Sequence, residues 1–276
     1  MIRHRLLRDP WIWASLGVLM GVCVLVIAAP RFMASGSETS DPGAMTQLLP
    51  PSLAHPFGTD HLGRDLYARV LAGGRYSLLI GPLVIGLSVL ISVPLGALAG
   101  TLGGWFDELV MRITDIFLAF PQLLLAVALA AALGTGFDVL VLALVLTWWP
   151  WYARLMRAQA LALRRREYVI ASEALGAGRL LVVWRHIIPN AMTPILVQAT
   201  SDMGAAILAG AALSFLGLGV QPPAADWGQL VSDGRVYFPD RWWYATFPGG
   251  MIFVVAMAFG VLGDVLHTAL DPRLRS

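Results

Sequence analysis

Five long stretches of this 276-residue chain contain no Asp, Glu, Lys or Arg. They cover residues 10–30, 76–106, 116–137, 203–225 and 242–263. A helix needs about 20 predominantly apolar residues to cross the hydrocarbon core of a bilayer, and each stretch is long enough. Charged residues make up only 13% of the chain, against about 25% in a typical soluble domain. The sequence therefore predicts an all-α protein with several membrane spans and excludes an ordinary water-soluble enzyme.

A sixth span is predicted from a shorter apolar stretch that is followed by arginine. Residues 139–153 carry no charge, and Arg154 and Arg157 come directly after them. A long arginine side chain near a helix end can reach the lipid headgroups while its stem stays in the membrane. We therefore expect a helix over residues 138–159.

The 203–225 stretch needs different boundaries, because Pro222 and Pro223 do not suit the interior of a helix. We expect this span to cover residues 192–219, which places Asp202 inside the membrane. Six spans put both ends of the chain on the same side of the membrane.

The arginines predict which side faces the cytoplasm. The chain has no lysine, so arginine supplies all 19 of its basic side chains. With the N-terminus inside, 13 arginines face the cytoplasm, and the six that face outward are Arg31, Arg64, Arg69, Arg75, Arg235 and Arg241. Cytoplasmic loops are enriched in Lys and Arg, so both termini are predicted to be cytoplasmic. A net charge of only +2, with arginines beside helix ends, argues against nucleic-acid binding.

The predicted organisation follows from this topology. Residues 1–34 form a cytoplasmic tail and the first span, residues 35–74 form an extracytoplasmic segment, and residues 75–276 form a five-helix core with a cytoplasmic loop at 160–190. The first span is longer than the 7–15-residue apolar region of a signal peptide, which favours a retained membrane anchor. These loops leave no room for a nucleotide-binding domain.

Glycine and proline are frequent inside the predicted spans. In a membrane, small residues let helix backbones approach closely, and proline bends are tolerated because neighbouring groups satisfy the backbone. The pattern predicts tight helix packing, helices that bend to open a path, or both. The residues include Pro82, Gly86, Pro94, Gly96, Gly100, Pro121, Gly204, Gly210 and Gly260.

The chain lacks the common catalytic motifs, including a glycine-rich phosphate loop, a His-Glu-x-x-His pair and a Cys-x-x-Cys pair. Its single cysteine excludes an internal disulfide. The nearest approach to a metal site is a group of four potential ligands: His55, Asp60, His61 and Asp65. We favour a structural interpretation, in which Gly58 and Gly63 form turns before an amphipathic helix at 65–71.

Acidic residues inside the membrane are functional candidates. Asp115 is expected to pair with Arg112, and Asp264 lies near the inner end of the last span. Asp202 is the deepest of the three. It is expected to line a water-filled path or to accept hydrogen bonds from a neighbouring helix. One such acid is weak support for the proton relay of an ion-coupled secondary transporter.

The inner loop at 160–190 contains a predicted short helix over residues 166–175. Tyr168, Ala171 and Leu175 share one of its faces, and Gly176 is placed to end it. Such an element can dock into a groove of another protein or lie on the lipid headgroups with its arginines on phosphates. The residues alone leave both interpretations open.

Within this loop, Ala171-Ser-Glu-Ala-Leu-Gly176, followed after 13 positions by Pro189, resembles the cytoplasmic EAA loop of binding-protein-dependent ABC importer permeases. Ile170 and Ser172 depart from that motif, as do His186 and Ile188 before the proline. Further stretches resemble the dipeptide/oligopeptide/nickel importer subfamily. They are His55-Pro-Phe-Gly-Thr-Asp-His-Leu-Gly-Arg-Asp65, Arg185-His-Ile-Ile-Pro-Asn190, Leu213-Ser-Phe-Leu-Gly-Leu-Gly-Val-Gln-Pro-Pro223, and Leu262-Gly-Asp264 with Leu270-Asp-Pro-Arg-Leu-Arg275.

This resemblance implies a type I-like importer permease with six spans and a cytoplasmic coupling helix in the inner membrane. It implies a second, homologous permease, two ATP-binding subunits that hold ATP and Mg²⁺, and an external substrate-binding protein. The expected ATPase contacts are Tyr168, Ala171, Glu173, Ala174, Leu175 and Gly176. The expected binding-protein contacts lie in segments 55–71 and 221–241 and include Asp60, Arg64, Asp226 and Trp227.

The resemblance also narrows the function. It implies a transport subunit that imports small peptides and has no catalytic site, cofactor or metal of its own. Nickel or glutathione import within the same subfamily is the alternative. An ion-coupled secondary transporter is the alternative from a different class, and it would require further intramembrane acids and repeated halves.

Overall fold

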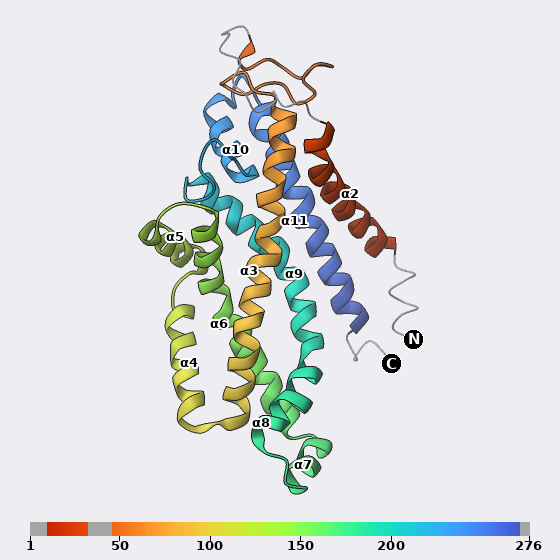
Figure 1. Ribbon diagram of the computed structural model, residues 1–276, viewed down its shortest axis with the longest axis vertical. Helices are drawn as coiled ribbons and strands as arrows, with labels where there is room; N and C mark the ends of the chain where they lie inside the picture. The colour runs from red at the N-terminus through yellow and green to blue at the C-terminus, as the bar shows by residue number, and fades with distance from the viewer. Residues whose placement is uncertain (1–9, 33–45, 271–276) are drawn as a thin grey trace.

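The computed structural model describes residues 10–32 and 46–270, and in this part of the chain all elements of secondary structure longer than a turn are helices (Figure 1). The predicted all-α fold is confirmed. Among the described residues, five helices are long and apolar enough to span a membrane, and the number is six if the bent pair α4–α5 counts as one span. The long helices are α2 (Pro10–Phe32), α3 (Leu66–Leu102), α4 (Gly104–Leu118), α5 (Gln122–Leu133), α6 (Phe137–Arg164), α9 (Ile188–Phe215) and α11 (Trp243–Leu270). The short ones are α7 (Glu167–Ala174), α8 (Arg179–Val182), the π-helical turn Val183–Ile187, α10 (Trp227–Gly234) and the 3₁₀ turn Arg235–Tyr237.

Helix α3 begins ten residues earlier than the charge-free stretch predicts. Asp65 caps it by accepting a hydrogen bond from the backbone N–H of Ala68, so the predicted helix at 65–71 forms the first turns of the span. The expected boundary at residue 74 therefore lies inside α3. At 37 residues, the helix is about 55 Å long, compared with about 30 Å for the bilayer core. Its length therefore exceeds what one direct crossing of the bilayer core requires.

The third span differs most from its prediction. Instead of one helix at 116–137, α4 and α5 meet at a 90° bend, with Pro121 between them. Helix α4 begins at Gly104, directly after a turn at Gly103, so it starts 12 residues before the predicted span. The charged residues of α4 interrupt the apolar stretch, so the sequence did not place them in the span; two of them, Asp107 and Asp115, pair with arginines of α6.

The remaining boundaries shift by one to two turns. Helix α6 continues five residues past the predicted 138–159, and α9 begins and ends about four residues before the predicted 192–219. The chain ends that carry the predicted cytoplasmic Arg3, Arg5, Arg8, Arg273 and Arg275 lie outside the described residues, as do the side chain of Arg31 and the 271–275 part of the resemblance.

The long helices form a bundle in which α3, α6 and α9 lie at the centre (Figure 1). Helices α2 and α11 cover one side, and α4 and α5 cover the other. Segment 46–65 and α10 lie at one end of the bundle, and α7 and α8 lie at the opposite end. A large apolar cluster joins α3, α6 and α9, and a second one joins α2, α3, α10 and α11.

Small residues allow the central helices to touch, as predicted. A Cβ atom added at Gly100 of α3 would lie 2.8 Å from the Ala160 Cβ of α6. One added at Gly204 of α9 would lie 2.6 Å from the Ala256 carbonyl oxygen of α11. Backbone approach of this kind supports helix association in a membrane, where the hydrophobic effect does not drive it.

We predict that Gly204→Leu lowers the free energy of unfolding by about 1–3 kcal/mol, because the new side chain collides with the α11 backbone. The matched control is Gly86→Leu, since Gly86 is exposed and a Cβ there would meet nothing within 4 Å. Unfolding by sodium dodecyl sulfate in mixed micelles measures both. Equal effects of the two substitutions would contradict the packing argument.

Candidate functional site

The loop between α6 and α9 forms a compact projection at one end of the bundle (Figure 1). Helix α7 occupies almost the whole of the predicted 166–175 helix, and Gly176 ends it in a left-handed conformation with φ of +90°. Val169 is fully buried and attaches α7 to the apolar core. Ser172 Oγ lies 3.2 Å from Nε2 of His186, which tethers α7 to the π-helical turn.

The exposed surface of α7 contains most of the residues expected to contact an ATPase. Leu175 is 90% exposed and Tyr168 is 45% exposed. Ala171, Ala174 and Gly176 are also exposed, whereas Glu173 is half-buried with an Oε1 atom that has no hydrogen-bond partner. Their role as coupling contacts stays a prediction.

Ile170 belongs to the same exposed surface, and the sequence reasoning missed it. It is 53% exposed and lies next to the buried Val169. The resemblance marked Ile170 only as a departure from the motif. Its position inside the predicted helix was the available signal that it could be a surface contact.

Ion pairs connect α4 to α6 near the same end of the bundle. Arg157 Nη2 donates to Asp107 Oδ2 over 2.6 Å, and Arg154 pairs with Asp115. Two expectations are corrected here: Asp115 does not pair with Arg112, which lies 3.6 Å from Glu108, and the two α6 arginines turn toward α4 rather than toward headgroups. A carboxylate on an adjacent helix provides a direct counter-charge for a guanidinium.

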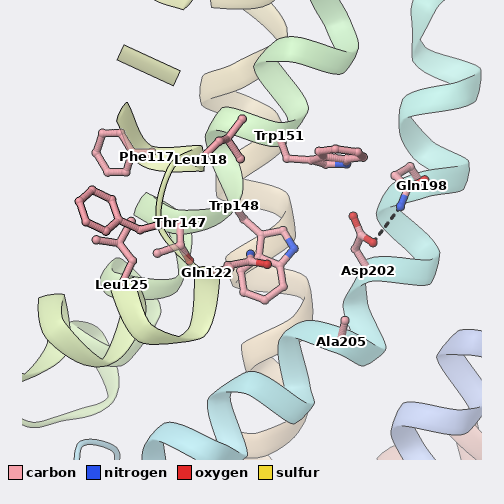
Figure 2. A pocket seen from close by; sticks show the side chains of 11 residues that line it. Phe117, Leu118, Gln122, Leu125, Thr147, Trp148, Trp151, Gln198, Asp202 and Ala205 are labelled. Atoms are coloured by element: carbon pink, nitrogen blue, oxygen red, sulfur yellow. Dashed lines mark hydrogen bonds between the residues drawn. The ribbon is translucent and has the colours of Figure 1, made fainter. Parts of the chain in front are cut away.

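A pocket of about 340 Å³ lies between the α4–α5 bend, α6 and α9 (Figure 2). Asp202 of α9 lines it. One carboxylate oxygen accepts a hydrogen bond from Tyr152 Oη (2.6 Å), and the other accepts one from Gln198 Nε2 (2.9 Å). The hydrogen bond from Tyr152 of α6 agrees with the expectation that Asp202 accepts from a neighbouring helix. Its place on a transport path stays a prediction.

Aromatic residues form much of the remaining wall, and the sequence reasoning did not identify them. Trp148 and Trp151 project from α6 toward the space that Asp202 enters (Figure 2). The run Trp148-Trp149-Pro150-Trp151 was a visible signal inside a predicted span. The other lining residues are Phe117, Leu118, Phe120, Gln122, Leu125, Thr147, Gln198 and Ala205.

At the opposite end of the bundle, Asp60 holds segment 46–65 to α3. Its carboxylate is fully buried and accepts hydrogen bonds from Arg64 Nε (2.7 Å) and Arg69 Nη1 (3.1 Å). The backbone N–H groups of Leu62 and Arg64 donate to the same carboxylate. The expectation that Asp60 contacts a binding protein is therefore corrected, because its carboxylate is buried and is paired with groups inside the protein.

Asp226 and Trp227 are also buried, so they do not present a surface for a binding protein either. Asp226 caps α10 by accepting from the backbone N–H of Gln229, and it accepts a hydrogen bond from Ser214 Oγ over 2.6 Å. Burial raises the pKa of Asp226 above its usual range, although these hydrogen bonds oppose the shift. Trp227 donates from Nε1 to the Val70 carbonyl oxygen and so attaches α10 to α3.

The two histidines among the potential metal ligands of segment 46–65 form hydrogen bonds within the protein. His55 Nδ1 lies 2.8 Å from Asp65 Oδ2, and His61 Nδ1 lies 2.8 Å from Tyr244 Oη. Gly58 and Gly63 form turns with positive φ, as the favoured interpretation predicted. Among the described residues, no group of three His, Cys, Asp or Glu side chains is arranged to hold a metal ion.

A second pocket, of about 480 Å³, opens beside the N-terminal end of α3. Arg64, Arg69 and Arg75 contribute to its wall together with Tyr76 and residues 223–225. Of the four residues expected to contact a binding protein, only Arg64 lines this opening. It retains that predicted role.

Comparison with known proteins finds transport system membrane proteins. The family model described as "Binding-protein-dependent transport system inner membrane component" matches residues 92–276. The chain is 44% identical over 263 residues to the probable D,D-dipeptide transport system permease protein DdpC of Escherichia coli, covering 94% of this chain and 88% of that one. It is 41% identical over 265 residues to the oligopeptide transport system permease protein OppC of Bacillus subtilis, covering 95% and 86%.

Solved structures support the fold. An inward-facing form of the MetNI methionine ABC transporter contains a chain with a TM-score of 0.55 and 19% identity to this one, covering 72% of this chain and 95% of that chain. An amino acid ABC transporter contains one with a TM-score of 0.54 and 16% identity, covering 74% and 94%. The bundle described above is therefore the fold of type I ABC importer permeases.

We predict that Asp60→Ala lowers the free energy of unfolding by about 3–5 kcal/mol, because it leaves the buried Arg69 without its counter-charge. The control is Asp240→Ala, an exposed acid near the same end, which should change stability little. Denaturant titration of the two variants checks this. A small effect of Asp60→Ala would contradict the stabilising role assigned to this carboxylate.

Proposed function

The chain belongs to the family of binding-protein-dependent transport system inner membrane components, and we propose that it forms half of the path by which an ATP-driven importer takes up small peptides. The main support is similarity along nearly the whole chain to permeases named for peptides. Besides the two relatives above, the dipeptide transport system permease protein DppC of Bacillus subtilis is 39% identical over 99% of this chain. A homologous second permease would form the other half of the path.

The projection around α7 is proposed to dock into a groove on one of two cytoplasmic ATP-binding subunits. Those subunits would bind ATP and Mg²⁺ and perform the hydrolysis. The exposed Tyr168, Ile170 and Leu175 give α7 an apolar surface that suits a protein groove. Arg164, Arg165 and Arg166, directly before it, are typical of a cytoplasmic loop.

This docking assigns the membrane orientation. With α7 in the cytoplasm, segment 46–65 and α10 lie outside the membrane and face the substrate-binding protein. The first residue of α2 and the last of α11 point toward the α7 end of the bundle (Figure 1), which supports two cytoplasmic termini. The basic opening beside α3, with Arg64 in its wall, is proposed as part of the binding-protein contact.

The position of α7 in the chain suggests how ATPase movement reaches the path. Only Arg165 and Arg166 separate α7 from α6. On its other side, residues 179–215 form one helical segment that includes α9. Helices α6 and α9 carry Trp151 and Asp202 into the pocket, so a displacement of α7 would move two of its walls. A rigid element that connects two arrangements of a bundle is a common basis of such switching.

The substrate assignment is tested with the complete transporter in proteoliposomes, using its second permease, ATPases and binding protein. We expect ATP-dependent uptake of a labelled dipeptide and no comparable uptake of Ni²⁺. Uptake of Ni²⁺ in place of the dipeptide would support the nickel alternative. Uptake by this chain without ATPases, driven by an ion gradient, would overturn the ABC assignment.

We predict that Leu175→Glu abolishes co-purification of the ATP-binding subunits, because it places a charge on the exposed apolar surface of α7. The matched control is Leu53→Glu, a fully exposed leucine at the opposite end of the bundle. Both variants should insert and fold normally, which size-exclusion chromatography checks. Intact assembly and transport with Leu175→Glu would contradict the docking proposal.

A further inference from the structure

The Asp202 carboxylate differs from the two α4 acids that pair with α6, because its partners carry no charge. Asp107 and Asp115 each pair with an arginine of α6. Asp202 accepts hydrogen bonds from a phenol and an amide, and among the described residues it forms no ion pair. An uncompensated carboxylate at membrane depth is costly, and such residues usually serve a ligand or ion.

The two hydrogen bonds orient this carboxylate without using its full capacity. Tyr152 donates to Oδ2 and Gln198 donates to Oδ1. An ionised carboxylate has about four acceptor positions, so each oxygen retains one. Asp202 is only partly buried and faces the pocket, which leaves those positions accessible to a ligand (Figure 2).

The pocket wall is suited to a cation. Trp148 and Trp151 face the same space as Asp202, and two phenylalanines of the α4–α5 region complete an aromatic lining. A cation over an aromatic ring is attracted by the negative face of the ring, and tryptophan is the strongest such partner. Aromatic rings provide no ligands for a metal ion, so the site favours an ammonium group over a divalent metal.

We propose that this pocket binds the α-ammonium group of the transported peptide, by an ion pair with Asp202 and by cation–π contact with Trp148 and Trp151. The proposal rests on the peptide substrate proposed above and assigns one of its groups to a specific part of the path. The amide of Gln122 lies in the same wall and is available for the peptide backbone. At about 340 Å³, the pocket falls within the range of about 300–1,000 Å³ for small-molecule sites.

The site is expected to be weak. A substrate in transit must bind well enough to enter and loosely enough to leave. The neutral donors around Asp202 meet both needs, because they hold the carboxylate in place without neutralising the charge that attracts the ammonium group.

The test is saturation-transfer NMR on the complete transporter in lipid nanodiscs, without binding protein or nucleotide. The probes are Ala-Ala and N-acetyl-Ala-Ala, which differ in the charge of the N-terminus. For the wild type we expect clear saturation of Ala-Ala and much less of the acetylated peptide. Asp202→Asn should weaken Ala-Ala binding by about tenfold, the usual scale of a charged hydrogen bond, and leave the acetylated peptide unchanged.

Three variants separate binding from structure. Asp202→Glu keeps the charge and should preserve the preference for the free amine. Trp151→Leu should weaken Ala-Ala binding while Asp202 remains intact. Asp264→Asn, an exposed acid of α11 outside the pocket lining, should have no effect.

The proposal is overturned if acetylation does not weaken binding to the wild type, or if Asp202→Asn binds both peptides as the wild type does. Saturable Ni²⁺ binding that is lost in Asp202→Asn would also overturn it, in favour of a metal site. Wild-type uptake of the dipeptide with ATP and binding protein is measured in parallel. If uptake occurs while the ammonium preference is absent, this inference fails and the proposed function stands; if peptide uptake is absent, the proposed function itself fails.

Discussion

Close contact between α3 and α6 determines where the other helices can lie. Gly96 and Gly100 leave room for the α6 backbone, and Ser92 Oγ donates across the gap to the Trp149 carbonyl oxygen over 2.6 Å. Bonds of this kind are worth about 0.6–2 kcal/mol between membrane helices. Asp60 and its arginine partners lie at the N-terminal end of α3, so the same contact connects them to α6, the helix that leads into α7.

Helix α9 packs against α11 with one face and lines the pocket with another, and this explains the position of Asp202. Ser201 and Gly204 contact α11, where a Cβ added at Gly204 would collide with the α11 backbone. Gln198, Asp202 and Ala205 follow at helical spacing on a different face and line the pocket. Packing against α11 therefore directs the acid toward α6. A movement of α9 would carry Asp202 with it.

Local signals predicted a large part of this structure. The charge-free stretches located α2, α3, α9 and α11, because a membrane helix is specified by the absence of charge along one continuous segment. The predicted end of α7 at Gly176 and the predicted helix start at Asp65 were both correct, because helix caps depend on residues within a few positions. The first half of α4 was missed because Asp107 and Asp115 interrupt the apolar stretch, and their partners are arginines of α6, about 40–50 positions away in the chain.

Charge has two opposite uses in this protein, and sequence alone does not distinguish them. Asp60 and Asp202 both looked like functional acids, one outside the membrane and one within it. The structure surrounds Asp60 with two guanidinium groups and two backbone N–H groups, so its charge stabilises the fold and none of it reaches a ligand. Asp202 receives only neutral donors and opens into an aromatic pocket. The difference lies in the charge of the partners, which only the three-dimensional arrangement of α3, α6 and α9 determines.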